Sequence, residues 1–182
     1  MDLRIERTKR CIKDAFIELR KIKPIEKITV KELAMLASIN KATFYSHYND
    51  IYDLSEQLEN ETIFSILENI PHIDSLITNP AIAIEELTDT LIKQKAFTDI
   101  LFSGSRSGLY AKKLETGIKT QVFNQYPEHK NDFHWNMILT YLIQGGLYSS
   151  TTYLPVNPKE TQRLLCELNV LITEHFITKQ NK

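Results

Sequence analysis

The side chains best suited to chemistry lie in the segment from Ile39 to Asp50, which combines three aromatic residues, a histidine, a lysine and several small polar residues. A buried helix would be more uniformly apolar, and a solvated helix would carry more charge. Wound as a helix at about 100° per residue, the segment places Phe44 and Tyr48 on one face and His47 at its boundary. The opposite arc offers a methyl group, hydroxyls, a phenol and an ammonium group, from Lys41, Ala42, Thr43, Tyr45 and Ser46.

This outward arc matches the surface of a DNA major groove. Small residues let the helix backbone approach the base edges, and serine, threonine and tyrosine hydroxyls bond to phosphate oxygens. Lys41 adds positive charge at a helix N-terminus, which itself favours phosphate. The alternative is a short amphipathic surface helix with a tyrosine-rich rim, and these residues alone leave it open.

Charge is distributed unevenly along the chain. The net charge is −1, but residues 1–50 hold 11 lysines and arginines against 7 aspartates and glutamates, and the remainder holds 11 against 16. A basic N-terminal quarter beside an acidic remainder indicates an anionic partner for the first part only. A chance fluctuation of composition remains the alternative.

The sequence offers little for other chemistries. Cys11 and Cys166 have no partner at metal-ligand spacing, and we interpret both as packing residues. His129 and His134 are five residues apart, a poor spacing for a metal on one helix. No Ser/His/Asp arrangement, phosphate-binding glycine loop or redox pair is present. We therefore expect no enzymatic activity, no metal and no cofactor.

The elements that must position the segment are helical. Only five glycines occur in 182 residues, and long patterns of period 3.6 predict an all-α protein. An apolar stripe from Ile5 to Leu19 predicts a first helix, closed by Pro24. Thr29 and Glu32 have the form of a capping box, and Asn40 can cap the next short helix, which we expect to reach about Tyr48. The two short helices have the spacing of a helix-turn-helix.

The rest of the chain predicts longer helices. Asn49 or Asp50 caps one that ends at Pro71, and Asn79-Pro80 and Asn157-Pro158 open two more. Further helical patterns cover 97–101, 108–126 and 132–153, for a total of about nine helices. Without a Gly/Ser/Pro-rich linker after the motif, we expect movement in the C-terminal part to be transmitted directly to it. The predicted domains are 1–50 and 51–182.

Neither a membrane span nor a signal peptide is predicted. No apolar run approaches the roughly 18 residues that cross a bilayer, and the N-terminal segment lacks the apolar stretch of a secretion signal. We expect a cytoplasmic protein without a membrane partner.

The motif resembles a known family. TVKELA from Thr29 and INKATFYSHY from Ile39 resemble the helix-turn-helix signature of the TetR (tetracycline repressor) family, over about residues 5–60. The C-terminal part resembles the family only in length, helical pattern and the GGL run at Gly145. The resemblance implies a transcription regulator, most simply a repressor. It would be a homodimer that binds a palindromic double-stranded DNA operator and is released by an unidentified small-molecule effector in its helical C-terminal domain.

The resemblance also assigns residues. Thr29 would bond a phosphate, and Asn40 takes the place of the usual serine at the start of the recognition helix. The positions at which the family meets DNA are Lys41, Ala42, Thr43, Tyr45, Ser46 and His47, with Tyr45 and His47 on phosphates.

Two positions depart from the family pattern. Ser38 stands where the turn glycine is usual, in a turn where positive φ is expected. Ile51 replaces the usual lysine at the start of the fourth helix, so we expect weaker non-specific affinity, or compensation from Arg4, Arg7 or Lys9. The alternative function is an interaction protein that keeps the fold, does not bind DNA alone and acts through a partner regulator.

For the C-terminal part, the sequence suggests a dimer interface and a pocket. Small residues four apart in the penultimate helix, Gly145 with Ser149 and Gly146 with Ser150, allow another helix to approach closely. With the leucines of the last helix they predict a homodimer through the last two helices, internal packing being the alternative. Aromatic residues are the pocket candidates, although for each one taken singly the core is the favoured interpretation: Phe64, Phe97, Tyr110, Phe123, Trp135 and Tyr141.

Overall fold

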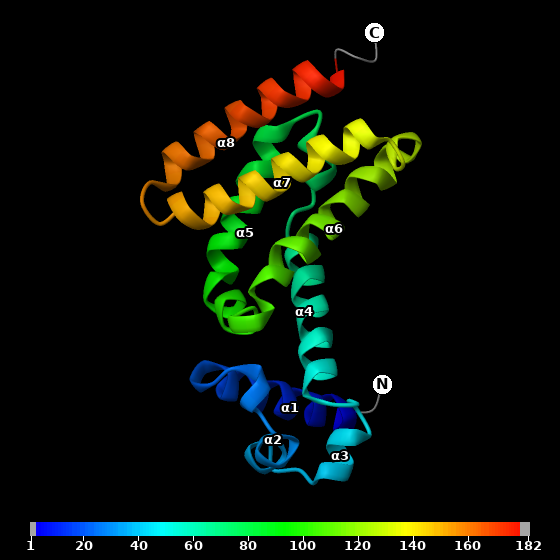
Figure 1. Cartoon of the computed structure of the whole chain (residues 1–182), viewed down its shortest axis with the longest axis vertical. Helices are drawn as coiled ribbons and strands as arrows, with labels where there is room; N and C mark the ends of the chain where they lie inside the picture. The colour runs from blue at the N-terminus through cyan, green and yellow to red at the C-terminus, as the bar shows by residue number, and fades with distance from the viewer. Residues whose placement is uncertain (1–2, 179–182) are drawn as a thin grey trace. The chain divides into compact units, whose positions relative to one another are not determined.

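The computed structural model describes residues 3–178, and none of these residues forms a β-strand (Figure 1). The predicted all-α fold is confirmed. The helices are α1 (Leu3–Ile22), α2 (Val30–Leu36), α3 (Lys41–Tyr45), α4 (Ile51–Glu68), α5 (Pro80–Leu101), α6 (Ser107–Gln125), α7 (Phe133–Tyr153) and α8 (Pro158–Thr173), followed by a π-helical turn at Glu174–Thr178. The expected number of about nine included a separate helix at 97–101, which is the last part of α5. None of the described helices is long and apolar enough to span a membrane.

Helix starts follow the polar residues that the sequence offers as caps. In each case a side-chain oxygen accepts a hydrogen bond from a backbone N–H of the first turn, which would otherwise lack a partner. The Asn40 carbonyl oxygen accepts from Thr43 N at 2.7 Å, and the Thr29 hydroxyl accepts from Glu32 N at 3.3 Å. The confirmed caps are Thr29, Asn40, Asp50 and Asn157.

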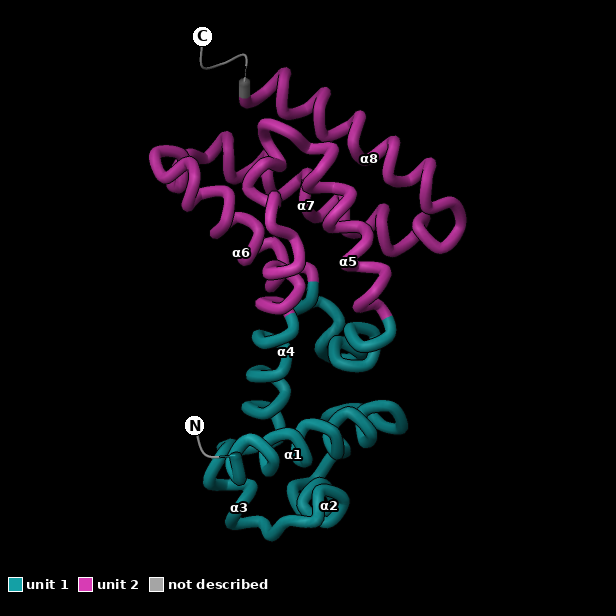
Figure 2. Tube along the Cα trace, turned by 180° about the vertical axis from the view of Figure 1, so that it is seen from behind, with its two compact units in different colours: residues 1–62, 96–110 teal, residues 63–95, 111–182 magenta. Residues whose placement is uncertain are grey.

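The chain packs into two compact units (Figure 2). Unit 1 consists of residues 1–62 and 96–110, and unit 2 of residues 63–95 and 111–182. Helices α4, α5 and α6 each contribute residues to both units. The boundary predicted from the sequence, after residue 50, is the end of the helix-turn-helix motif. The compact units instead divide α4 itself, because this helix runs without interruption from Ile51 to Glu68 and packs in both units.

In unit 1, a buried arginine joins α1 to the end of α5. Arg20 is only 4% exposed, and its Nη2 donates to the carbonyls of Ile100 at 3.3 Å and Ser103 at 3.1 Å and to the Ser103 hydroxyl at 2.6 Å. These carbonyls lie at a helix C-terminus, where orphan acceptors and the negative end of the helix dipole both favour a cation.

A second polar pair of unit 1 joins α4 to the 3₁₀ turn before α6. The Glu59 side chain is 0% exposed and accepts two hydrogen bonds from the Arg106 guanidinium, at 2.8 and 2.7 Å. Ser55 Oγ donates to the same carboxylate at 2.9 Å. The hydrogen bonds from Arg106 to Glu59 raise the pKa of the guanidinium, against the opposing effect of burial. Removing either partner would leave an uncompensated charge in a buried place.

Unit 2 is held by close helix crossings and a polar network between α6 and α7. At Gly117 of α6, an added Cβ would lie 2.3 Å from Leu67 Cδ1 of α4, so a larger residue there would require the Leu67 side chain to move. Glu115 of α6 accepts from Thr140 Oγ1 at 2.6 Å and from Gln144 Nε2 at 2.7 Å, both on α7, and pairs with Lys119 at 2.8 Å.

Candidate nucleic-acid interface

Helices α2 and α3 are joined by a turn that contains a left-handed residue. Ser38 has φ of +55°, so the expectation of positive φ at this position is confirmed. Ile39 N donates to Ala34 O at 2.9 Å, which satisfies a carbonyl at the end of α2. The turn therefore keeps a glycine-type geometry with a serine in it.

Helix α3 has the two faces that its sequence predicts. Phe44 and Tyr48 are almost completely buried, and their rings lie 5.7 Å apart. Tyr45 is 57% exposed, and the other outward residues are exposed or half-buried. The exposed ones are Lys41, Ala42 and Ser46, and the half-buried ones are Thr43 and His47. The predicted orientation is confirmed, whereas contact with DNA stays a prediction.

The helix is shorter than expected because its end tightens. It ends at Tyr45 rather than near Tyr48. Ser46 Oγ donates to Thr43 O at 2.7 Å, and His47 N donates to Phe44 O at 3.0 Å, three residues back. Such tight turns are common at helix ends.

The polar side chains at the starts of α2 and α3 already make hydrogen bonds within unit 1. Asn40 Oδ1 also accepts from the Thr43 hydroxyl at 3.0 Å, while the Glu32 carboxylate accepts from Lys23 Nζ at 2.5 and 2.6 Å. Thr29 and Asn40 are both exposed, so each can still face a second molecule.

Residue 51 is unavailable for a phosphate contact. Ile51 is 6% exposed and packs in the core of unit 1. Next to it, the Asp53 carboxylate accepts from Asn49 N at 2.7 Å and from Asn49 Nδ2 at 2.9 Å. The backbone bond from Asn49, followed by a bond from Gln57, lowers the pKa of Asp53 and keeps it charged. The start of α4 is therefore acidic rather than basic.

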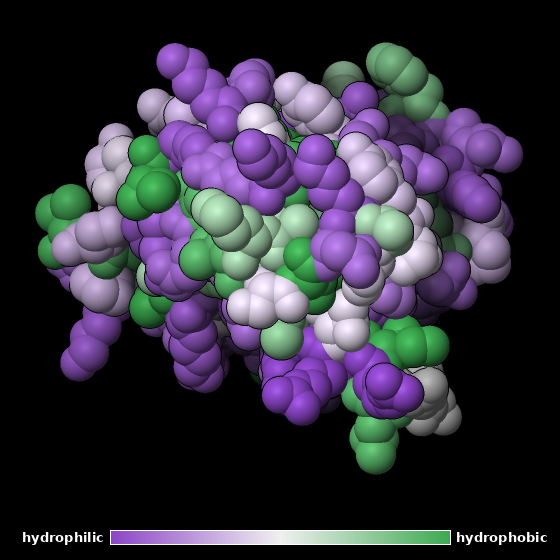
Figure 3. Space-filling view, turned by 90° about the horizontal axis from the view of Figure 1, so that it is seen from below, coloured by the Kyte–Doolittle hydropathy of each residue, from purple (hydrophilic) through white to green (hydrophobic). Residues whose placement is uncertain are grey.

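The surface of α1 supplies cations that the start of α4 lacks. Arg7 and Arg10 are exposed, as is Arg4, and Lys9 is half-buried. Lys13 is paired with Glu61 at 2.5 Å. Figure 3 shows hydrophilic residues interspersed with smaller hydrophobic areas on the face that it views. Compensation by the α1 residues stays a prediction.

The six aromatic pocket candidates are not gathered around one cavity. Phe97 and Tyr110 belong to unit 1, where Tyr110 packs against Phe102 at 5.0 Å. Phe123 and Trp135 are buried in unit 2, and Trp135 stacks on His129 at 4.0 Å. Phe64 and Tyr141 are 63% and 69% exposed. Their role in ligand binding stays a prediction.

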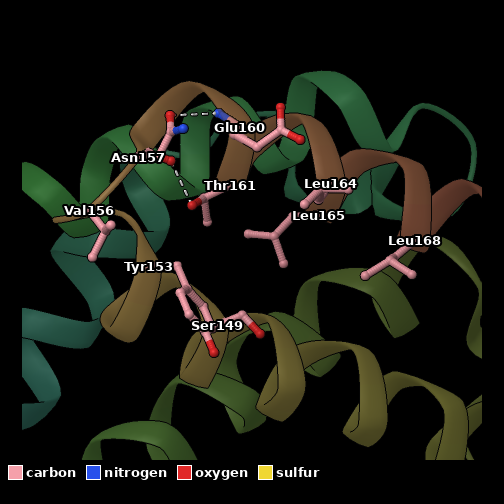
Figure 4. Close-up of a pocket in the computed structure, with 9 residues that line it drawn as sticks. All are labelled: Ser149, Tyr153, Val156, Asn157, Glu160, Thr161, Leu164, Leu165 and Leu168. Atoms are coloured by element: carbon pink, nitrogen blue, oxygen red, sulfur yellow. Dashed lines mark hydrogen bonds between the residues drawn. The ribbon is translucent and has the colours of Figure 1, made fainter.

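Two of the cavities of unit 2 lie beside α7 and α8, and those aromatic residues do not line them. The outer cavity, of about 330 Å³, lies between the end of α7 and α8 (Figure 4). Its lining is mostly apolar and comprises Ser149, Tyr153, Val156, Asn157, Glu160, Thr161, Leu164, Leu165 and Leu168. The inner cavity, of about 30 Å³, is lined by residues of α5, α6, α7 and α8. Leu165 lines both cavities.

The two glycines of α7 are not close crossing points within the described chain. A Cβ added to Gly145 or Gly146 would meet no described atom within 4 Å. On the exposed surface of α7 and α8 lie large apolar residues: Met137, Tyr141, Tyr148, Leu164, Leu168 and Leu171. Sequence reasoning did not identify the inner cavity, because its polar residues are ordinary threonine, serine and asparagine side chains.

No protein-family model matches this sequence, and no curated protein matches it at a significant level. Functional inference therefore depends on the residues and geometry described above.

Proposed function

We propose that this protein is a cytoplasmic, dimeric, sequence-specific transcription regulator that inserts α3 into the DNA major groove. Most simply it is a repressor that a small molecule releases. The observation that carries the proposal is the division of α3 into two faces. Phe44 and Tyr48 anchor it in unit 1, while Lys41, Ala42 and Tyr45 project away from the core.

The exposed face suits a groove in size and in chemistry. Ala42 and Ser46 are small, so the backbone of α3 can approach base edges, and Thr43 and Tyr45 offer hydroxyls at its sides. In helix-turn-helix proteins the first residues of the second helix make the base contacts. The capped start of α3 at Asn40 keeps those residues helical without DNA. The resemblance to the TetR family supports the same orientation.

A second copy of the chain completes the proposal. Exposed leucines of α8 and tyrosines of α7 form an apolar surface that a monomer would leave in water. Pairing through this surface about a two-fold axis would present two copies of α3 to two half-sites, which is why we propose a palindromic operator.

The alternative function is an interaction protein that acts through a partner regulator. The buried Ile51 and the acidic start of α4 favour it, because they remove a cation at a position where the resembling family has one. The two functions differ in whether the pure protein binds DNA.

A footprint on the DNA upstream of its own gene tests the proposal. We expect protection of two half-sites at low salt. Lys41→Ala should weaken binding about tenfold and lower the slope of log affinity against log salt by about one unit. Tyr45→Ala should also weaken binding about tenfold. Lys112→Ala removes the same charge at an exposed position of unit 2, on α6 and outside the proposed dimer surface, and should leave binding unchanged.

Two results would count against this function. Absence of protection at low salt would favour the interaction protein. Equal losses in the variants of α3 and in the Lys112→Ala control would show that α3 does not contact the DNA.

A further inference from the structure

The exposed face of α3 lacks most of the side chains that pair with G·C base pairs. Arginine or lysine reads guanine, and aspartate or glutamate reads cytosine. From Ile39 to Asn49 the sequence holds one lysine, Lys41, and no arginine or carboxylate. Asp50 follows, but its Oδ1 accepts from Asp53 N at 2.8 Å at the start of α4. Of these charged readers, the motif therefore offers DNA the ammonium group of Lys41.

The hydroxyl groups on either side of the α3 face have already used their hydrogens within the motif. Thr43 Oγ1 lies 3.0 Å from Asn40 Oδ1, and Ser46 Oγ lies 2.7 Å from Thr43 O. Thr43 N also donates to Asn40 Oδ1 at 2.7 Å, which identifies that oxygen as an acceptor. A backbone carbonyl is likewise an acceptor, so both hydroxyls are the donors in these pairs. Towards a second molecule they present lone pairs, which accept hydrogen bonds.

Asn40 is restricted by the same hydrogen bonds. An asparagine reads adenine when its oxygen accepts from N6 while its amide nitrogen donates to N7. Asn40 Oδ1 already accepts from the backbone and from the hydroxyl of Thr43. An amide oxygen has two lone pairs, so Asn40 would have to give up part of the cap of α3 to make the paired contact with adenine.

The methyl group of Ala42 is the remaining feature of this face. Ala42 is exposed, and it lies about 200° around the helix from the buried Phe44. In the major groove both kinds of base pair present an amino donor, so hydroxyl lone pairs discriminate poorly between them. Thymine alone presents a methyl group, which alanine contacts. The contact between two methyl groups removes apolar surface from water and needs no donor.

We propose that Ala42 reads a thymine through its 5-methyl group, so that each half-site has an A·T pair at this position. The inference rests on the proposed function, since it requires α3 in the major groove. It goes further by stating the chemistry of the base contact. Cytosine lacks the 5-methyl group, so a C·G pair at the same position leaves the methyl group of Ala42 without an apolar partner.

A library of random-sequence duplexes, bound by the pure full chain at low salt, tests the inference. We expect an enriched palindrome with a thymine at one fixed position of each half-site. In one enriched duplex, deoxyuridine then replaces each thymine in turn, which keeps every hydrogen-bonding group and removes only the methyl group. Replacement of the thymine that faces Ala42 should weaken binding about fourfold in one half-site and about fifteenfold in both.

The same position tests the methyl group on a different base. When 5-methylcytosine replaces cytosine in a C·G pair there, the methyl group returns without the other groups of thymine. We expect the methylated duplex to bind about fourfold more tightly than the unmethylated one. This comparison uses only the unaltered protein, so it does not depend on how any variant folds.

Two variants assign the effect to Ala42. Ala42→Gly removes the methyl group of the protein, so the ratio of affinities for the thymine and deoxyuridine duplexes should fall from about four to about one. The ratio compares two duplexes with one protein, so any loss of helix stability caused by glycine cancels from it. Lys41→Ala is the control, because it should weaken binding to both duplexes equally and leave the ratio at about four.

The thymine contact is overturned if no deoxyuridine replacement weakens binding, if 5-methylcytosine and cytosine bind equally, or if Ala42→Gly keeps the fourfold ratio. Any of these results with an enriched palindrome leaves the proposed function standing and removes only the thymine contact. A library that yields no enriched sequence removes both, because the pure protein then does not recognise a DNA sequence.

Discussion

Ser38 is the residue at which the helix-turn-helix departs most from a relaxed backbone. It adopts φ of +55° with a Cβ, in a region that costs L-residues roughly 1–2 kcal/mol. Glycine adopts this region without strain but loses more conformational entropy on folding. The two effects oppose each other, and the removal of strain is the larger.

We therefore expect Ser38→Gly to increase the free energy of unfolding by about 0.5–1 kcal/mol. Gly104 provides a reciprocal control, since it has φ of +61° and open space around it. Gly104→Ala should lower the free energy of unfolding by a similar amount. Urea denaturation at neutral pH measures both, and a less stable Ser38→Gly would show that the serine side chain stabilises the turn.

At the scale of helices, the features that could be predicted from the sequence are those that depend on residues close together in the chain. Caps such as Asn40 and Asn157 and the orientation of Phe44 and Tyr48 follow from residues within one or two turns. The bond of Arg20 to Ser103 could not be predicted, because it spans 83 residues and no local pattern encodes it.

The aromatic pocket candidates show the same limit. Phe64 and Tyr141 have residue types that favour burial, but both are exposed, since side-chain type does not determine which face of a helix is covered. The burial of Asn169 Oδ1, which has no donor among the described residues, could not be predicted either, because it depends on four helices that meet around this side chain.

The contact between α6 and α7 should depend on pH through Glu115. Burial opposes the charge of this carboxylate, but hydrogen bonds from Lys119, Thr140 and Gln144 outweigh burial and lower its pKa to about 2. The unfolded chain has an ordinary glutamate pKa near 4.5. The stabilisation is therefore fully present above about pH 4.5 and is lost as pH falls from there towards 2.

We expect Glu115→Gln to lower the free energy of unfolding by about 2 kcal/mol at pH 6 and by much less at pH 3. Glu85→Gln makes the same charge change at an exposed position of α5 and controls for general charge effects. Urea midpoints at the two pH values measure the difference. An equal loss at both values would mean that Glu115 contributes through packing rather than charge.

At the scale of the whole molecule, the exposed leucines of α8 should set the oligomeric state. Leu168 is 53% exposed and lines the outer cavity, so a carboxylate there would have to be desolvated in a dimer through α7 and α8. We expect Leu168→Asp to weaken dimerisation at least tenfold and to abolish cooperative binding to two half-sites. Sedimentation velocity at micromolar concentration measures this.

Ile92→Asp is the matched control, because Ile92 is 48% exposed and belongs to α5 rather than to α7 or α8. It should leave the sedimentation coefficient unchanged. A wild-type protein that sediments as a monomer would contradict the dimer directly.

The discontinuity of unit 1 also has a consequence during synthesis. Glu59 leaves the ribosome 47 residues before Arg106, its partner in a buried pair. At about 5–20 residues per second this is a delay of roughly 2–9 s. Throughout that interval Ser103 is not yet available to Arg20, nor Arg106 to Glu59, so we expect the core around these two side chains to stay hydrated. We therefore expect unit 1 to be completed only after residues 96–110 have been made, and not as soon as its first 62 residues leave the ribosome.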